Sequence, residues 1–431
     1  MLMNLIQLMG LVILASVIQA NYKVPSPITL MGGIIMFSIF GMKPFEFEAK
    51  EFDTIVMITL PLLIGADALK LKWVDLKKHG FSLFWVAVIS VLSFIVIGVA
   101  AKFLFFDSYP INIAGMTLLF CMVAATDPIT VSAIFANFKV PHKLKVLTEG
   151  ESLFNDATSL IVFSVALVAL ATPETVTWSF IGLKTVSVIF GALVVGLVSG
   201  LLTTIALRLS GEPFVEASII LFFAYISYLV AEHYHFSGIL AVIITVVMAN
   251  RMIQKIIDKE DCDIEAANKS RNYGLLIYAV TTRQNQKTVT KIINFLSMFA
   301  SALLFVSIAA VVDIDKAILY KTEILLLFAA STVIRGLTML KFAFLSNQVA
   351  SMQKIQRHWW SVLTFSGSKG ALSILMVHMI PNTFKHKEMF EHVVIGNIVL
   401  STFAYALVLA FIFMKDKAKF AKECEEETVG H

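Results

Sequence analysis

Long apolar stretches follow one another along almost the whole chain, separated by short polar clusters, and this pattern constrains the fold most strongly. A helix needs about 20 apolar residues to cross a bilayer. Of the 431 residues, 58% are hydrophobic and only 15% are charged, which is more apolar surface than a water-soluble fold can bury. We therefore predict an all-α polytopic membrane protein. A soluble enzyme, a nucleic-acid-binding protein and a secreted scaffold are excluded.

Thirteen stretches are candidate transmembrane helices. They lie at about 3–20, 26–42, 53–69, 83–105, 111–137, 148–172, 180–207, 215–232, 236–250, 292–312, 322–345, 360–380 and 391–414. The hydrophilic stretch 251–291 is predicted to be a loop. Residues 1–414 are then one transmembrane domain, and residues 415–431 are a short cytoplasmic tail.

The basic residues between the candidate helices predict the orientation. With the N-terminus outside, the cytoplasmic loops and tail carry 24 Lys and Arg residues and the outer connections carry 8. Cytoplasmic loops are enriched in basic residues, so the N-terminus is predicted outside and the C-terminus in the cytoplasm, with the chain in the cell membrane. This distribution also accounts for the net charge of +4 without a nucleic-acid partner.

An internal symmetry follows if 180–207 is a linker helix. The two remaining sets of six helices, at about 3–172 and 215–414, then begin on opposite sides of the membrane, as in the inverted repeats of many secondary transporters. The fifth helix of each half contains a breaker, at 126–128 and at 366–370. Interruptions in matching positions of two halves indicate a binding site near the bilayer midplane, with the broken helices crossed. Two ordinary kinked helices are the alternative.

Charged and hydroxyl side chains at the first break favour a small hard cation. Pro128 disfavours helical geometry at Asp127, so carbonyl oxygens near Thr126 and Asp127 should be freed at bilayer depth. In the next helix, Ser152 and Asp156 are one turn apart and add two oxygen donors. Oxygen ligands of this kind suit hard cations. The alternative is a buried aspartate that caps a broken helix end.

Three further charges are expected to be supporting structure. Arg335 needs an acidic partner at membrane depth, and we predict that this partner is Glu151, because Glu151 lies on a different face of its helix from Asp156. Lys369, in the second break, would offset the partial negative charge of a half-helix C-terminus. The three acidic and two basic residues leave one negative charge in the core, as required for binding one proton or one monovalent cation.

At these residues the chain resembles the NhaP-type sodium/proton antiporters of the monovalent cation:proton antiporter superfamily. The resemblance rests on four segments: Ala125-Thr126-Asp127-Pro128, Gly150-Glu151-Ser152-Leu153-Phe154-Asn155-Asp156, Arg335-Gly336 and Gly367-Ser368-Lys369-Gly370. It implies a thirteen-helix fold with a dimerisation bundle, a mobile six-helix core and alternating access in a homodimer.

The resemblance also implies roles for single residues. Asp156 would be the shared cation and proton carboxylate, and Asp127, Ser152 and Thr126 would complete the coordination, with Glu151 able to reach the ion through water. The supporting residues would be Asn155, Arg335 and Lys369. The family usually has arginine at the position of Lys369. The electrogenic branch has two adjacent aspartates where this chain has Asn155 and Asp156, which points to electroneutral one-for-one exchange.

The predicted function is therefore exchange of Na⁺, with Li⁺ as a second candidate, for H⁺ by a transporter that is not an enzyme and holds no resident cofactor. The expected partners are monovalent cations, protons and the lipid bilayer. The near alternative is K⁺/H⁺ antiport, because no motif reports the size of the cavity. A cation channel and an organic-anion carrier are weaker alternatives, because the site is single and asymmetric and its net charge is negative.

Overall fold

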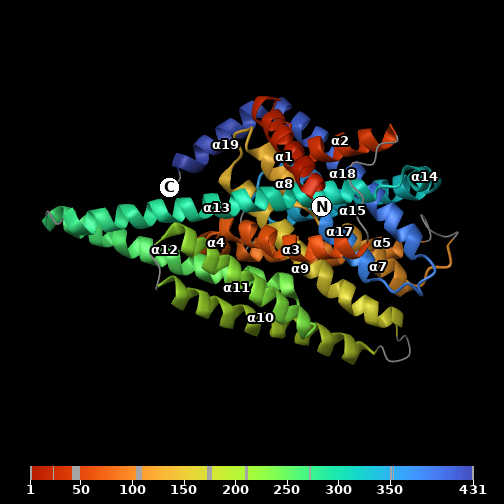
Figure 1. Cartoon of the computed structure of the whole chain (residues 1–431), viewed down its shortest axis with the longest axis horizontal. Coiled ribbons are helices and arrows are strands. Elements are labelled where there is room, and N and C mark those ends of the chain that lie inside the picture. Colours follow the sequence, from red (N-terminus) through yellow and green to blue (C-terminus); the bar gives the residue numbers. More distant parts are fainter. Residues whose placement is uncertain are drawn as a thin grey trace. The chain divides into compact units, whose positions relative to one another are not determined.

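The computed structural model describes residues 2–22, 24–40, 49–102, 109–171, 177–208, 212–270, 273–349, 352 and 354–429. Every regular element within these ranges is a helix (Figure 1). In chain order they are α1 (Leu2–Tyr22), α2 (Ser26–Ile39), α3 (Ala49–Lys70), α4 (Trp73–Phe84), the π-helical turn η1 (Trp85–Ile89), α5 (Ser90–Ala100), α7 (Ile113–Ala124), α8 (Pro128–Phe135), α9 (His142–Ala171), α10 (Trp178–Leu207), α11 (Pro213–His233), α12 (Gly238–Ser270), α13 (Tyr273–Val311), α14 (Ile314–Leu319), α15 (Lys321–Leu345), α16 (Trp359–Phe365), α17 (Ala371–Met379), α18 (Lys387–Lys415) and α19 (Lys417–Val429).

The chain folds into two compact units. The first contains residues 1–57, 79–183 and 301–431, and it holds both interrupted helices together with α9, α15 and α18. The second contains residues 58–78 and 184–300, and α11 packs against α12 within it. Every predicted site residue belongs to the first unit.

The predicted membrane helices all fall on observed helices, and the all-helical membrane fold is confirmed. Within the described residues, nine helical segments are long and apolar enough to cross a bilayer, and residues 9–22 and 26–39 form shorter apolar helices. The count of thirteen crossings and the inverted repeats stay predictions. The fourth predicted helix begins about ten residues too late, because the helical segment from Trp73 to Ala100 starts in a polar stretch.

The prediction of a loop at 251–291 is wrong. Helix α12 continues to Ser270 and α13 begins at Tyr273, so the stretch is helical on both sides of residues 271–272. Hydropathy indicates which residues are apolar enough for a bilayer. It does not report helix formation in water, where Lys, Arg, Gln, Glu and Ala are all good helix formers. The segments of these two helices that are apolar enough for the membrane are Gly238–Lys255 and Asn285–Val311.

The tail forms helix α19, whose acidic residues bind other helices of the first unit. The Glu427 carboxylate accepts hydrogen bonds from the backbone N–H groups of His142, at 2.7 Å, and Lys143, at 3.4 Å. These amides open α9 and have no acceptor within their own helix, so the carboxylate satisfies them and complements the helix dipole. The indole of Trp359 in α16 donates to Glu423 at 3.0 Å. Helix α19 therefore joins the starts of α9 and α16.

Candidate functional site

The two interrupted helices touch where each of them is broken. Helix α7 ends at Ala124 and α8 begins at Pro128, while α16 ends at Phe365 and α17 begins at Ala371. The backbone N–H of Asp127 donates to the carbonyl of Ser368 at 2.7 Å, and the Ser368 hydroxyl donates to the carbonyl of Asp127 at 2.9 Å. Backbone groups freed at Asp127 and Ser368 are thus satisfied across the two breaks, which is one way in which non-helical backbone is tolerated at membrane depth.

Pro128 explains the position of the first break. Asp127 has φ −114° and ψ 121°, the extended conformation that a following proline favours. The chain leaves the helix after Ala124 and stays non-helical through Asp127, so the N–H of Thr126 is released from the helical pattern. This N–H donates to the Oδ1 atom of Asp156 at 3.0 Å. A carboxylate of α9 is thereby fixed to the unwound segment.

A stripe of polar residues on α9 follows the unwound segment. The Ser152 hydroxyl donates to the Thr126 carbonyl at 2.9 Å and accepts a hydrogen bond from the Thr126 hydroxyl at 3.1 Å. The Asn155 amide donates to the carbonyl of Ala124 at 2.8 Å and lies 3.2 Å from the Thr126 hydroxyl. Ser152, Asn155 and Asp156 therefore meet Thr126 from one face of a single turn of α9.

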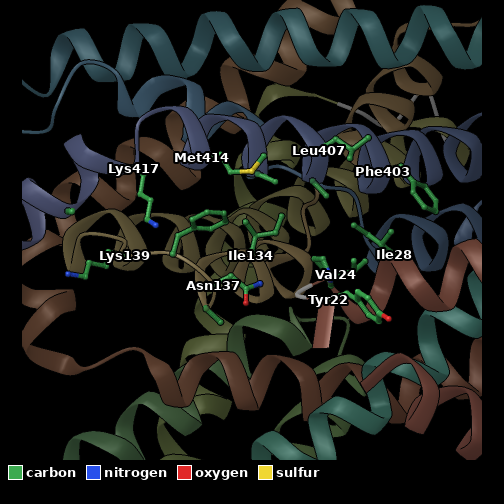
Figure 2. Close-up of a pocket in the computed structure, with 16 residues that line it drawn as sticks. Tyr22, Val24, Ile28, Ile134, Asn137, Lys139, Phe403, Leu407, Met414 and Lys417 are labelled. Atoms are coloured by element: carbon green, nitrogen blue, oxygen red, sulfur yellow. The ribbon is translucent and has the colours of Figure 1, made fainter. Parts of the chain in front are cut away.

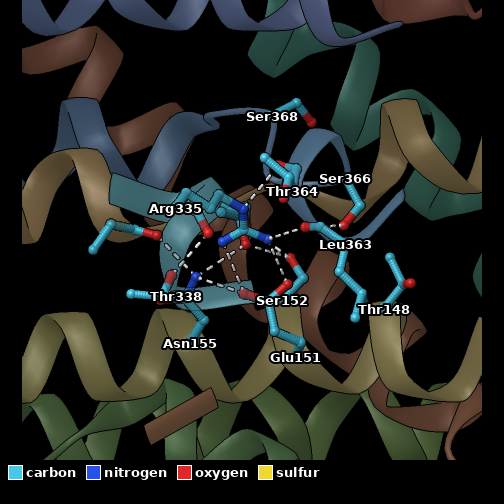
Figure 3. A network of polar contacts seen from close by, with 12 residues as sticks. Thr148, Glu151, Ser152, Asn155, Arg335, Thr338, Leu363, Thr364, Ser366 and Ser368 are labelled. Atoms are coloured by element: carbon cyan, nitrogen blue, oxygen red, sulfur yellow. Dashed lines mark hydrogen bonds and ion pairs between the residues drawn. The ribbon is translucent and has the colours of Figure 1, made fainter. Parts of the chain in front are cut away.

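The predicted ion pair between Glu151 and Arg335 is present. The guanidinium of Arg335 donates to both carboxylate oxygens of Glu151, at 3.1 and 2.9 Å (Figure 3). Both side chains are buried. Arg335 also donates to the carbonyls of Leu363 and Thr364, each at 3.0 Å, near the C-terminus of α16. These carbonyls lack partners within the helix, and a cation there also suits the helix dipole.

Lys369 is buried in the second break, with 2% of the residue exposed. Its ammonium lies 5.7 Å from the ring centroid of Phe94, and its backbone N–H donates to the Ser401 hydroxyl at 3.1 Å. A cation over an aromatic face is attracted by the negative face of the ring. This arrangement places the amine of Lys369 within the core of the first unit, directly after the residue that binds Asp127.

Burial separates the acidic residues into two kinds. Glu151 is 0% exposed and fully used by Arg335 and Asn155. Asp127 and Asp156 are only partly buried. A charge that is sealed within the protein must be neutralised by a fixed partner, whereas a partly accessible carboxylate can exchange a bound ion with water. The arrangement therefore holds one buried ion pair beside two acidic residues that are less completely buried.

The structure brings all the predicted site residues into one unit, and it adds residues that the sequence did not indicate. Ser368 joins the two breaks, and Leu363 and Thr364 hold Arg335. The run of small residues at 366–370 indicated a break, but nothing in it selects one serine. Backbone carbonyls leave no trace in a sequence at all, and Ser401 gave no signal because it lies within an apolar stretch.

Two glycines give a test of the crossing. A Cβ atom on Gly370 would lie 2.6 Å from the Cβ atom of Asp127, whereas on Gly336 the first contact would be at 3.7 Å. We expect Gly370→Ala to lower stability by about 1–3 kcal/mol through overpacking. Gly336→Ala should leave stability unchanged or raise it, because alanine suits a helix better. Thermal unfolding of the two purified variants measures this, and equal melting temperatures would contradict the close approach.

The fold and the site together define a class, an all-helical multi-pass membrane protein with two interrupted helices that cross at a polar centre. The transmembrane model of the sodium/hydrogen exchanger family matches residues 8–264 of the chain. The chain belongs to this family, and the predicted resemblance is confirmed.

Individual relatives agree with the family match. A "Low-affinity Na(+)/H(+) antiporter NhaS1" of Synechocystis is 26% identical over 366 residues, which is 84% of this chain and 64% of that protein. A "Na(+)/H(+) antiporter NhaH" of Halobacillus dabanensis is 34% identical over 197 residues, 44% of this chain and 47% of that protein. The chain thus spans less than two thirds of the length of either relative. The structure of the sodium proton antiporter MjNhaP1 of Methanocaldococcus jannaschii shares the fold, with a TM-score of 0.70 at 18% identity over 97% of this chain and 98% of that one.

Proposed function

We propose that the protein is a secondary transporter that exchanges Na⁺ for H⁺, with the Asp156 carboxylate as the shared site for both. The observation that carries this proposal is the hydrogen bond from the Thr126 N–H to the carboxylate of Asp156, a residue that is only partly buried, at a helix break. A carboxylate held at an unwound segment can bind a hard cation together with neighbouring oxygens, and it can take up a proton when the cation leaves. Such a protein works as a carrier and not as an enzyme, and it needs no resident cofactor.

The coordination we propose for the cation combines Asp156 with Asp127, Ser152 and Thr126. Ser152 and Thr126 are already joined by hydrogen bonds between their hydroxyl groups and to the Thr126 carbonyl, so the oxygen atoms of these two residues lie close together. Glu151 would contribute only through water, because its oxygens bind Arg335. Asn155, Arg335 and Lys369 would support the site.

The charges favour a monovalent cation over an organic anion. Glu151 and Arg335 cancel as a pair. Asp127 and Asp156 then outnumber Lys369, the basic residue of the second break, and this excess of acidic groups favours a bound proton or cation. The relatives named above are called Na⁺/H⁺ antiporters, which supports sodium as the ion. We further propose alternating access of a homodimer, with Li⁺ as a second substrate, and K⁺/H⁺ exchange is an outcome that the test below would reveal.

Competition between the two ligands gives a test of this mechanism. Protons fill the Asp156 carboxylate as the pH falls, so the apparent affinity for Na⁺ should decrease by up to about tenfold per pH unit in the acidic range. The measurement is Na⁺-driven proton movement in proteoliposomes, followed with a pH-sensitive dye, with Li⁺ and K⁺ in parallel. Sodium affinity that does not vary with pH would contradict a shared carboxylate.

The same vesicles report stoichiometry. One proton exchanged for one monovalent cation moves no net charge, so an imposed membrane potential should not drive transport. Rapid uptake under voltage alone would show unequal exchange. A larger response to K⁺ than to Na⁺ would favour the K⁺/H⁺ alternative.

We propose that the chain lies in the cell membrane with its N-terminus outside and its C-terminus in the cytoplasm. Lys287 and Lys321 lie at opposite ends of the chain segment that contains the membrane part of α13, and both are exposed. In a cysteine-free background, Lys321→Cys should react with an impermeant thiol reagent in intact cells, whereas Lys287→Cys should react only after the cells are opened. The reverse pattern would invert the proposed orientation.

A further inference from the structure

A cavity of about 770 Å³ lies within the first unit, and no residue of either helix break lines it. It is bounded by the junction of α1 and α2, the end of α8, the last turns of α18 and the start of α19. Its walls are mainly apolar and include Ile28, Ile134, Phe403, Leu407 and Met414 (Figure 2). This volume lies within the usual range of ligand-binding pockets in proteins. Apolar walls favour a ligand with a hydrocarbon part, because apolar surface is then removed from water.

One end of the cavity is positively charged. Lys139 and Lys417 lie together at this end, and Tyr22, Ile28 and Phe403 lie at the opposite end (Figure 2). No acidic residue is among the described residues that line the cavity. Within the part of the chain that the structure describes, neither lysine forms an ion pair. The cavity is therefore polarised, with two positive charges at one end of an apolar chamber.

The acidic residues nearby are engaged elsewhere. Asp416, next to Lys417, accepts a hydrogen bond from Lys419 at 2.6 Å. Glu423 and Glu427, further along α19, bind Trp359 and the start of α9. These three carboxylates are thus directed to other partners, while Lys417 and Ala421 of α19 line the cavity. Lys417 is also the first residue of this helix, where the helix dipole favours a negative charge.

We propose that the cavity binds one anionic phospholipid, with its phosphate at Lys139 and Lys417 and an acyl chain along Ile134, Leu407 and Phe403. Basic pockets between membrane helices bind lipid head groups of this charge. The apolar walls account for the acyl chain, which a free phosphate lacks. The lipid would contact α8, whose first residue follows Asp127, and would join this half-helix to α2, α18 and α19.

The test is native mass spectrometry of the purified full chain with phosphatidylglycerol and with phosphatidylcholine of the same acyl composition. We expect phosphatidylglycerol to bind more tightly. The double variant Lys139→Gln with Lys417→Gln should weaken that binding about thirty-fold, as two lysines near a lipid surface predict. The charge-matched control, Lys354→Gln with Lys422→Gln, should stay within about twofold because neither residue lines the cavity.

A second variant tests the apolar part of the cavity. Ala410 lines the cavity from α18, and Ala404 lies on the same helix but does not line it. Ala410→Phe should fill the chamber and reduce phosphatidylglycerol binding, and Ala404→Phe should not. Thermal unfolding in lipid-free detergent checks that each variant is folded. Equal binding of the two lipids, equal losses in the lysine pairs, displacement of the lipid by excess inorganic phosphate, or unchanged binding by Ala410→Phe would each overturn the proposal.

Discussion

Asp156→Asn is expected to reduce cation/proton exchange to the level of protein-free vesicles while the protein stays folded. The asparagine side chain retains an oxygen that can accept the hydrogen bond from the Thr126 N–H, so the unwound segment keeps its attachment to α9. An amide takes up no proton near neutral pH and supplies no negative charge to a cation. Exchange measured with a pH-sensitive dye, together with the melting temperature, separates loss of function from loss of fold.

Glu149→Gln is the matched control for this substitution. Glu149 lies on the same helix, two turns before Asp156, where it accepts a hydrogen bond from Ser132 at 3.4 Å and lies 3.8 Å from Lys145. The change also removes one carboxylate from α9, but at a distance from the helix crossing. We expect this variant to keep its exchange. Robust exchange by Asp156→Asn, or equal losses in the two variants, would rule out Asp156 as the shared carboxylate.

The second large effect is expected at the buried ion pair. Glu151→Ala and Arg335→Ala should each cost about 3–5 kcal/mol, because each leaves its partner charged and buried. An apolar double replacement, Glu151→Leu with Arg335→Met, should recover part of this loss. Recovery should be incomplete, because the carbonyls of Leu363 and Thr364 lose the donor that Arg335 provides. Folded yield and melting temperature of the single and double variants give the coupling between the two residues.

A partly exposed pair, in which the side chains are 32% and 15% exposed, provides the comparison. Lys70 and Asp67 are 2.7 Å apart one helix turn from each other, and both remain accessible to solvent. Asp67→Ala should cost less than about 1 kcal/mol, since exposed pairs contribute little. Strictly additive losses at Glu151 and Arg335 would mean that the two charges act independently, in disagreement with the contacts in the structure.

Much of the candidate site could be predicted because charged residues are rare within apolar membrane segments. Each charge at bilayer depth is costly, so Asp127, Glu151, Asp156, Arg335 and Lys369 stood out against apolar neighbours. The break before Pro128 could also be predicted, because proline restricts the residue that precedes it. The pairing of Glu151 with Arg335 followed from the need to neutralise a buried arginine. These inferences use only the cost of a residue type in hydrocarbon.

The boundaries of helices in water could not be predicted in the same way. The hydropathy pattern indicates where a chain leaves the membrane. It does not indicate where a polar helix begins or ends, as at the end of α12 and the start of α13. The attachment of the tail could not be predicted either, because the hydrogen bond between Glu427 and the first turn of α9 joins residues 285 positions apart. Contacts over such distances depend on how helices pack.

The sequence by itself determined that this chain is an α-helical membrane protein with two interrupted helices, because the requirement to satisfy every backbone group in hydrocarbon leaves few alternatives. It also determined the family and the residues that carry charge in the core. Only the tertiary structure decided which oxygen atoms meet. The crossing of Asp127 with Ser368, the attachment of Thr126 to Asp156, and the carbonyls that hold Arg335 all depend on the packing of helices far apart in the chain. Residue type fixes the cost of burying a polar group, whereas packing geometry selects the partner that offsets it.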